Sequence, residues 1–193
     1  MLQLLPLKGG EKTRSAKLSY FGRVGYEFAG RYLLQASLRA DAADLSLLPA
    51  TNRWGYFPAV SVGWTVSEEK FFAPLKDHVS SLKLRASWGQ NGSLAALSGY
   101  AYSTDMALGG LYPFVMGNSY ITSAAPSTMG NDELKWETSE QINVGIDARF
   151  LNDRLTFSMD YFDKKTKDLL VSGTTPSLII GGSTSPMNAG NVS

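Results

Sequence analysis

Residues able to carry acid–base or metal chemistry are few in this sequence. His78 is the sole histidine and cysteine is absent, which excludes thiolate catalysis and cysteine-ligated zinc. Asp132, Glu133 and Glu137 are grouped in a polar stretch that leads into a predicted strand. With no histidine, nucleophile or phosphate-binding loop nearby, a solvated or capping role explains these carboxylates better than acid–base catalysis. We therefore predict no catalytic, metal or cofactor site, and a protein that is not an enzyme.

Stacking of aromatic rings on sugars is a second kind of chemistry, and it is open to residues 91–136, a stretch rich in Gly, Ser, Tyr and Pro. Its aromatic residues include Tyr100, Tyr102, Tyr112, Phe114 and Tyr120. Rings exposed in a concave mouth could stack on a substrate or pack against a partner protein, whereas packing within the loop is the alternative for each of them. Tyr112 and Tyr120 are the candidate substrate-binding residues.

The elements that must position these residues are strands. Charged residues make up 18% of the chain and aromatic residues 11%, and the 19 glycines favour turns. Six segments alternate apolar residues with polar or small ones at a period of two, which is typical of strands with two different faces. The segments are residues 20–28, 31–41, 56–65, 82–89, 141–150 and 155–162. An all-β fold is expected.

The connections between these segments alternate in length. Residues 29–31 and 151–154 are predicted as tight turns, because glycine, asparagine and aspartate suit them. Residues 41–52 form a longer loop, and residues 91–136 are predicted as a long, irregular and extracellular one.

The connection after the third segment carries a helix signal. Thr65 or Ser67 is predicted as its N-cap, Glu68 and Glu69 lie in the first turn, where the helix dipole favours carboxylates, and Pro74 ends it. One short helical turn is expected here.

The apolar faces of these strands could meet either a protein core or lipid. A soluble β-sandwich, such as a carbohydrate-binding module, would pack them against each other. Three features favour a transmembrane barrel: aromatic residues at the ends of the apolar faces, such as Tyr56 and Trp64; segments of about nine to eleven residues; and alternating short turns and long loops. We prefer the barrel and keep the sandwich as the alternative.

The stretch NRWGYFPAVSVGW allows a specific assignment of faces. Tyr56, Val60, Val62 and Trp64 are predicted to face lipid, whereas the small residues Ala59, Ser61 and Gly63 are predicted to face the lumen. Six strands are too few to close a barrel, so we expect a sector of a larger one. The net charge of +1 gives no indication of nucleic-acid binding.

Several blocks of sequence, taken together and in order, resemble a known family. The blocks are SYFGRVGYEFAGRYLLQASLRADAA, NRWGYFPAVSVGWTVSEEKFF, LKLRASWGQNG and NDELKWETSEQINVGIDARFLNDRLTFSMDYFDKKTKDLL. They are similar to the C-terminal half of the barrel in SusC/RagA-type TonB-dependent receptors of Bacteroidetes, over Ser19 to Leu170.

The resemblance implies an antiparallel transmembrane barrel of about 22 strands that holds a plug. Residues 19–170 would supply about six to seven of these strands with their short periplasmic turns and long extracellular loops. Residues 1–18 would be a preceding loop or strand end, and residues 171–193 an incomplete extracellular loop. The first residues do not read as a secretion signal, so we expect an internal piece of a longer protein.

The resemblance also implies a function and partners. Such receptors import oligosaccharides or peptides across the outer membrane of Gram-negative bacteria, with a SusD-like surface lipoprotein covering the extracellular mouth. TonB would engage an N-terminal part of the receptor outside this chain. The expected surroundings of the strands are therefore outer-membrane lipid on one face and the lumen on the other.

Overall fold

A computed structural model describes residues 15–116, 119–171 and 182–192 of the chain, and of residues 109–116 and 119–123 it describes only the backbone. The long strands are β1 (Leu18–Phe28), β2 (Tyr32–Ala42), β3 (Trp54–Thr65), β4 (Val79–Ser93), β5 (Asp105–Met116), β6 (Ser119–Met129), β7 (Glu137–Phe150) and β8 (Leu155–Lys167). The short elements are the 3₁₀ helices η1 (Val66–Glu68) and η2 (Lys70–Leu75) and the strands β9 (Leu170–Val171), β10 (Ser183–Thr184) and β11 (Met187–Asn188).

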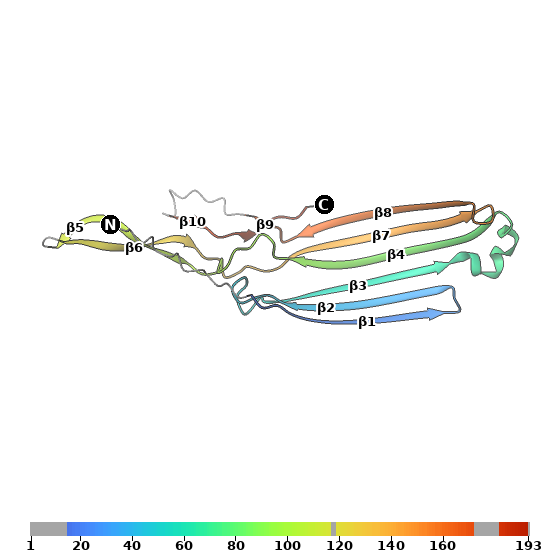
Figure 1. Ribbon diagram of the computed structural model, residues 1–193, viewed down its shortest axis with the longest axis horizontal. Coiled ribbons are helices and arrows are strands. Elements are labelled where there is room, and N and C mark those ends of the chain that lie inside the picture. The colour runs from blue at the N-terminus through green and yellow to red at the C-terminus, as the bar shows by residue number, and fades with distance from the viewer. Residues whose placement is uncertain (1–14, 117–118, 172–181, 193) are drawn as a thin grey trace, which may run out of the picture.

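Six long strands form one antiparallel sheet in the order β1-β2-β3-β4-β7-β8, which confirms the predicted all-β antiparallel fold. Tight turns and the two 3₁₀ helices lie at one end of the sheet, and the longer loops lie at the other (Figure 1). The hairpin of β5 and β6 projects beyond the loop end (Figure 1). Among the described residues, no helix is long and apolar enough to cross a membrane.

The register of the sheet brings the apolar residues of all six strands to one side. One row across the sheet is Tyr26, Leu34, Val62, Ala86, Val144 and Tyr161. The next row lies on the opposite face and is Glu27, Leu33, Gly63, Arg85, Gly145 and Asp160. Successive residues of a strand point to opposite faces, so the period of two in the sequence becomes one apolar and one mainly polar surface.

The apolar face is exposed along its length. Val24 is 72% exposed, Tyr26 60% and Tyr161 68%. In the described part of the chain, no second sheet is packed across this face. The β-sandwich alternative is therefore wrong, because a sandwich would bury these side chains between two sheets. A continuous exposed apolar face, formed by alternate residues of neighbouring strands, is typical of the lipid-facing side of a transmembrane barrel.

A cluster of buried hydrophobic residues lies at the loop end, beyond the strands of the main sheet. Leu48 and Leu134 are fully buried there, together with Ala43, Ala101 and Leu170. These residues come from three different connections and from β9, and hydrogen bonds also join these segments. For example, Asn52 Nδ2 donates to the carbonyl oxygen of Leu134 at 3.1 Å. The loop end of the sheet is thus a packed structure with its own small core.

The tight turns use left-handed backbone conformations. Residues 29–31 connect β1 to β2, and within this turn Ala29 and Gly30 have φ of 54° and 66° while the Arg31 amide donates to the carbonyl oxygen of Phe28 at 3.1 Å. Leu151, Asn152 and Asp153 have φ of 56°, 56° and 65° in the turn between β7 and β8. Asparagine and aspartate adopt this region readily, whereas leucine does so at a cost.

The prediction of an irregular stretch over residues 91–136 is wrong for most of its length. Strand β4 extends to Ser93, and β5 pairs with β6 from Asp105 to Met116 with several register shifts. Met106 and Leu108 on β5 are 54% and 79% exposed. Where its side chains are described, the hairpin leaves most of them exposed. A strand without a buried face needs no apolar alternation, so the period-two signal that identified the other strands is absent here.

The predicted short helix is present as η1 and η2. Thr65 is the N-cap residue of η1, as predicted, although its side chain makes no capping hydrogen bond, and Ser67 lies inside that helix. Pro74 lies inside η2, which ends one residue later. Glu69 separates the two helices in an extended conformation, and its side chain is held by Arg31 and Tyr32 from outside this connection.

Candidate functional site

The polar face of the sheet is hollowed. A depression of about 480 Å³ lies over the six strands of the main sheet and is lined in part by small residues such as Gly25, Ser61 and Gly145. A second depression of about 380 Å³ continues toward the loop end along Ala59, Ser61 and Gly89. The structure therefore places Ala59, Ser61 and Gly63 on the polar face, as the alternation predicts. The small side chains leave space above the polar face that another polar group can occupy.

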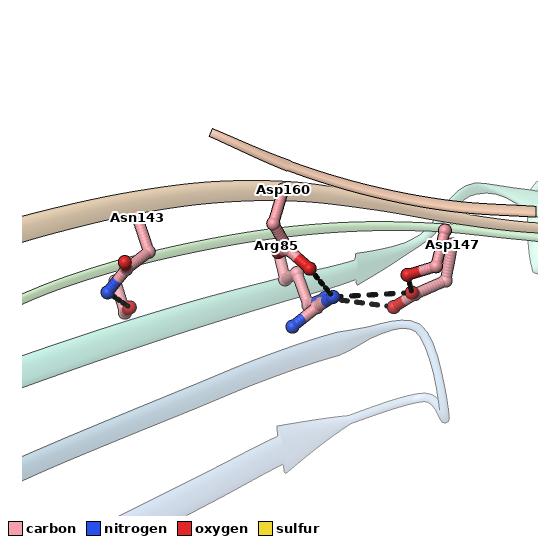
Figure 2. A network of polar contacts seen from close by, with 6 residues as sticks. Arg85, Asn143, Asp147 and Asp160 are labelled. Carbon is pink, nitrogen blue, oxygen red and sulfur yellow. Dashed lines mark hydrogen bonds and ion pairs between the residues drawn. The ribbon is translucent and has the colours of Figure 1, made fainter. Parts of the chain in front are cut away.

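Arg85 is the centre of a charged network on the polar face (Figure 2). Its Nε donates to Asp147 Oδ2 at 2.9 Å, and its Nη2 donates to Asp147 Oδ1 at 3.3 Å and to Asp160 Oδ2 at 2.9 Å. Ser158 Oγ also donates to Asp147 Oδ1, at 2.6 Å. The guanidinium fork thus joins three neighbouring strands, β4, β7 and β8, across the backbone ladder.

An uncharged chain of hydrogen bonds follows on the same face toward the loops. Gln141 Nε2 donates to Asn143 Oδ1 at 2.7 Å, and Asn143 Nδ2 donates to Ser87 Oγ at 3.3 Å. Asn143 lies beside the Arg85 network in Figure 2. The face offers both charged and neutral hydrogen-bonding groups, and this suits contact with water or with a polar protein surface rather than with lipid.

The apolar face ends in aromatic and charged residues at the loop end of the sheet. Trp88 Nε1 donates to Glu140 Oε1 at 2.7 Å, and Lys167 Nζ lies 2.6 Å from Glu140 Oε2. Charged residues therefore begin directly beyond the tryptophan, as they do where a membrane meets water.

At the other end of the apolar face, Tyr32 and Trp64 stack with their ring centroids 6.4 Å apart. On β7, the apolar residues run from Phe150 to Ile142, a length of about 27 Å at 3.3–3.4 Å per residue. Strands tilted by about 40° would make this band about 20 Å tall, close to the band of an outer-membrane barrel.

The residues considered for catalysis are placed in structural roles or in solvent. His78 is exposed, and its backbone oxygen accepts a hydrogen bond from the Leu151 amide at 3.3 Å. Glu137 Oε2 accepts from the Leu170 amide at 3.2 Å, which is the capping role expected for that group. In the part of the chain that the structure describes, no group of three possible metal ligands gathers.

The candidate substrate-binding residues Tyr112 and Tyr120 fall on strands β5 and β6. Their side chains lie outside the described residues, so their role stays a prediction. Two features were not identified from the sequence. Asp160 was not linked to Arg85, although both lie in segments that alternate, and Glu69 was expected only as a first-turn residue of a helix.

The fold and the site together define a class of protein: a sector of a membrane-spanning β-barrel, with an outer face for lipid and a polar inner face. The family described as "TonB dependent receptor-like, beta-barrel" matches residues 6–193. The chain belongs to this family, whose members are transporters of the Gram-negative outer membrane and not enzymes. The predicted resemblance to SusC/RagA-type receptors is confirmed.

Individual relatives agree with this assignment. The chain is 39% identical over 172 residues to the TonB-dependent receptor SusC of Bacteroides thetaiotaomicron. The matched residues make up 85% of this chain and 16% of SusC. It is 37% identical over 169 residues to the TonB-dependent receptor P39 of Formosa agariphila, covering 87% of this chain and 15% of P39. The chain therefore spans about one sixth of the length of these curated relatives.

A solved structure shares the fold. The RagAB peptide importer in its open-open state superposes with a TM-score of 0.76 at 26% identity, over 91% of this chain and 18% of the other. The six-stranded sheet is thus a sector of a TonB-dependent receptor barrel, and its polar face is the lumen face.

Proposed function

We propose that this chain forms part of the wall of a TonB-dependent outer-membrane transporter that imports oligosaccharides or peptides together with a SusD-like surface lipoprotein. The observation that carries the proposal is the two-faced sheet. Its outer rows are apolar and exposed, whereas its inner face is mainly polar and carries the Arg85 network. Such a sheet separates lipid from a polar interior, which is what the wall of a transport barrel does.

The loop end of the sheet is the side where we expect substrate and lipoprotein to bind. Long loops of outer-membrane barrels are extracellular, and here they pack around Leu48 and Leu134 and carry the projecting β5–β6 hairpin. Tyr112 and Tyr120 on this hairpin are the proposed substrate-binding residues. Similarity to RagAB, a peptide importer, supports peptides as one substrate class. TonB would contact a part of the receptor outside this chain.

An uptake assay tests this proposal in cells that carry the complete receptor. Fluorescent oligosaccharides and peptides are offered to cells with and without the receptor gene, before and after the proton gradient is collapsed. Accumulation that needs both the receptor and the gradient is expected for one of the two substrate classes. Equal accumulation with and without the receptor, for both classes, would contradict the proposal.

Two further measurements address the partner and the site. Purification of the receptor in mild detergent should recover a surface lipoprotein in a fixed ratio. Tyr112→Ala and Tyr120→Ala should reduce uptake without lowering the amount of receptor at the surface, because stacking on a substrate is lost while the backbone pairing of the hairpin is kept. Unchanged uptake in the double variant would remove both residues from the site.

A further inference from the structure

The connection between β3 and β4 is fastened to the lipid-facing side of the barrel. Glu69, between η1 and η2, accepts hydrogen bonds at Oε1 from Tyr32 Oη at 2.6 Å and from Trp64 Nε1 at 3.2 Å. Arg31 Nη1 lies 3.1 Å from Glu69 Oε2. Tyr32 and Trp64 pair in register on the apolar face. The carboxylate therefore holds the start of η2 beside lipid-facing rings.

The residues that follow expose apolar side chains in this position. Phe71 is 63% exposed and Leu75 is 50% exposed, whereas Phe72 between them is buried at 4%. A buried Phe72 is enough to attach η2 to the protein. Packing within the described residues therefore leaves the apolar surfaces of Phe71 and Leu75 without cover, and two such side chains this close together are costly to leave in water.

The neighbouring turn shows the same feature at the same end of the sheet. Leu151, in the turn between β7 and β8, is 59% exposed, and its amide donates to the carbonyl oxygen of His78 at 3.3 Å. The hydrogen bond joins this turn to the end of the β3–β4 connection. Exposed apolar residues are thus present at this end of the sheet on two neighbouring connections, beyond the ends of the strands.

We propose that Phe71 and Leu75 insert into the headgroup and upper acyl region of the periplasmic leaflet, so that η2 anchors this rim of the barrel to phospholipid. The short-turn end of an outer-membrane barrel is periplasmic. Lys70 directly precedes Phe71 and Lys76 directly follows Leu75, and both lysines are exposed. Lysine ammonium groups beside buried apolar side chains suit the level of the lipid phosphates.

A site-directed fluorescence experiment on the complete receptor tests the anchor. In a receptor without other cysteines, Phe71→Cys and Leu75→Cys are each labelled with an environment-sensitive dye and placed in phospholipid nanodiscs. Asp77→Cys is the matched control, because Asp77 is exposed on the same connection and is charged. Lipids brominated high on the acyl chain serve as the quencher, and a gel shift between boiled and unboiled samples confirms folding.

The expected result is quenching by brominated lipid at positions 71 and 75 that exceeds quenching at position 77 by at least about threefold, as insertion to the headgroup boundary requires. Two results would overturn the inference. Equal, weak quenching at all three positions would leave the connection in water. A blue-shifted dye at position 71 that lipid bromine does not quench would show burial against protein instead. The two labelled positions are independent, so failure of one variant to fold leaves the other decisive.

Discussion

Arg85 on β4 and Asp160 on β8 lie two strands apart, yet Arg85 Nη2 donates to Asp160 Oδ2 at 2.9 Å. The residue between them on β7 is Gly145, which pairs with both. A Cβ at this position would lie 2.5 Å from Asp160 Oδ1 and 2.9 Å from Arg85 Nε. Because Gly145 has no side chain, the guanidinium of Arg85 can cross β7 and reach the carboxylate of Asp160.

Gly145→Ala should separate Arg85 from Asp160 and weaken the wall of the lumen. The expected cost is about 1 kcal/mol, because the three charged side chains are all partly exposed. The temperature at which the purified receptor changes from its compact to its unfolded gel mobility measures the effect. Gly25→Ala is the control, since nothing lies within 4 Å of a Cβ added there. An equal shift in both variants would argue against the bridge.

Val60→Arg should hinder membrane assembly by about 2 to 4 kcal/mol, because it places a cation on the lipid face near the middle of the apolar band. Ser61→Arg lies one residue further on the lumen face and should be tolerated better. Folding yield into lipid vesicles, read from the same gel shift, compares the two. Equal yields would contradict the assignment of faces.

Gly92→Ala should disturb the contact between the aromatic rings of Phe57 and Trp136 near the loop end of the sheet. Phe57 is 6% exposed and packs edge-on against Trp136 at 5.4 Å between ring centroids. A Cβ on Gly92 would lie 2.1 Å from Phe57 Cζ and 2.9 Å from Trp136 Cε3, so the rings must move. Overpacking of this kind costs about 1–3 kcal/mol.

Thermal stability again measures the change, now with Gly99→Ala as the control, because a Cβ at Gly99 meets nothing within 4 Å. A larger loss of stability in Gly99→Ala than in Gly92→Ala would exclude crowding of Phe57 as the cause.

Acid should loosen the loop that follows β2. Asp44 accepts hydrogen bonds from the backbone amides of Ala16 and Ser46, and these lower the pKa of its carboxyl from 3.8 to about 2. A depressed pKa in the folded state gives stability that is complete above the ordinary value and is lost as pH falls toward about 2. Hydrogen exchange of the segment around Ser46, corrected for the intrinsic rate, should therefore accelerate between about pH 4 and pH 2.

Asp44→Asn is the matched variant for this measurement. Its amide oxygen can still accept one hydrogen bond but does not titrate, so exchange in the loop should be independent of pH over the same window. The same acid-induced acceleration in the variant and the original chain would show that another group is responsible.

The sequence by itself determined the strands of the main sheet and their faces. Alternation alone predicts that Val62 and Ala59 lie on opposite faces of the sheet, because successive residues of a strand point to opposite faces in any solvent. Glycine, asparagine and aspartate likewise marked the tight turns. The alternation and the aromatic residues favoured a transmembrane barrel with lipid on the apolar face, and the match in family and fold confirmed the barrel.

The tertiary structure alone decided which residues of different strands meet. Arg85 contacts Asp160 because the strand register places Gly145 between them. This register depends on the pairing of all residues along the neighbouring strands. Glu69 leaves its expected helical role because Tyr32 comes within reach only when β2 and β3 are paired. The β5–β6 hairpin and the buried cluster around Leu48 could not be predicted from the sequence either, because neither produces a repeating apolar pattern. Local periodicity fixes the direction of a side chain, whereas its partner is fixed by the packing of distant segments.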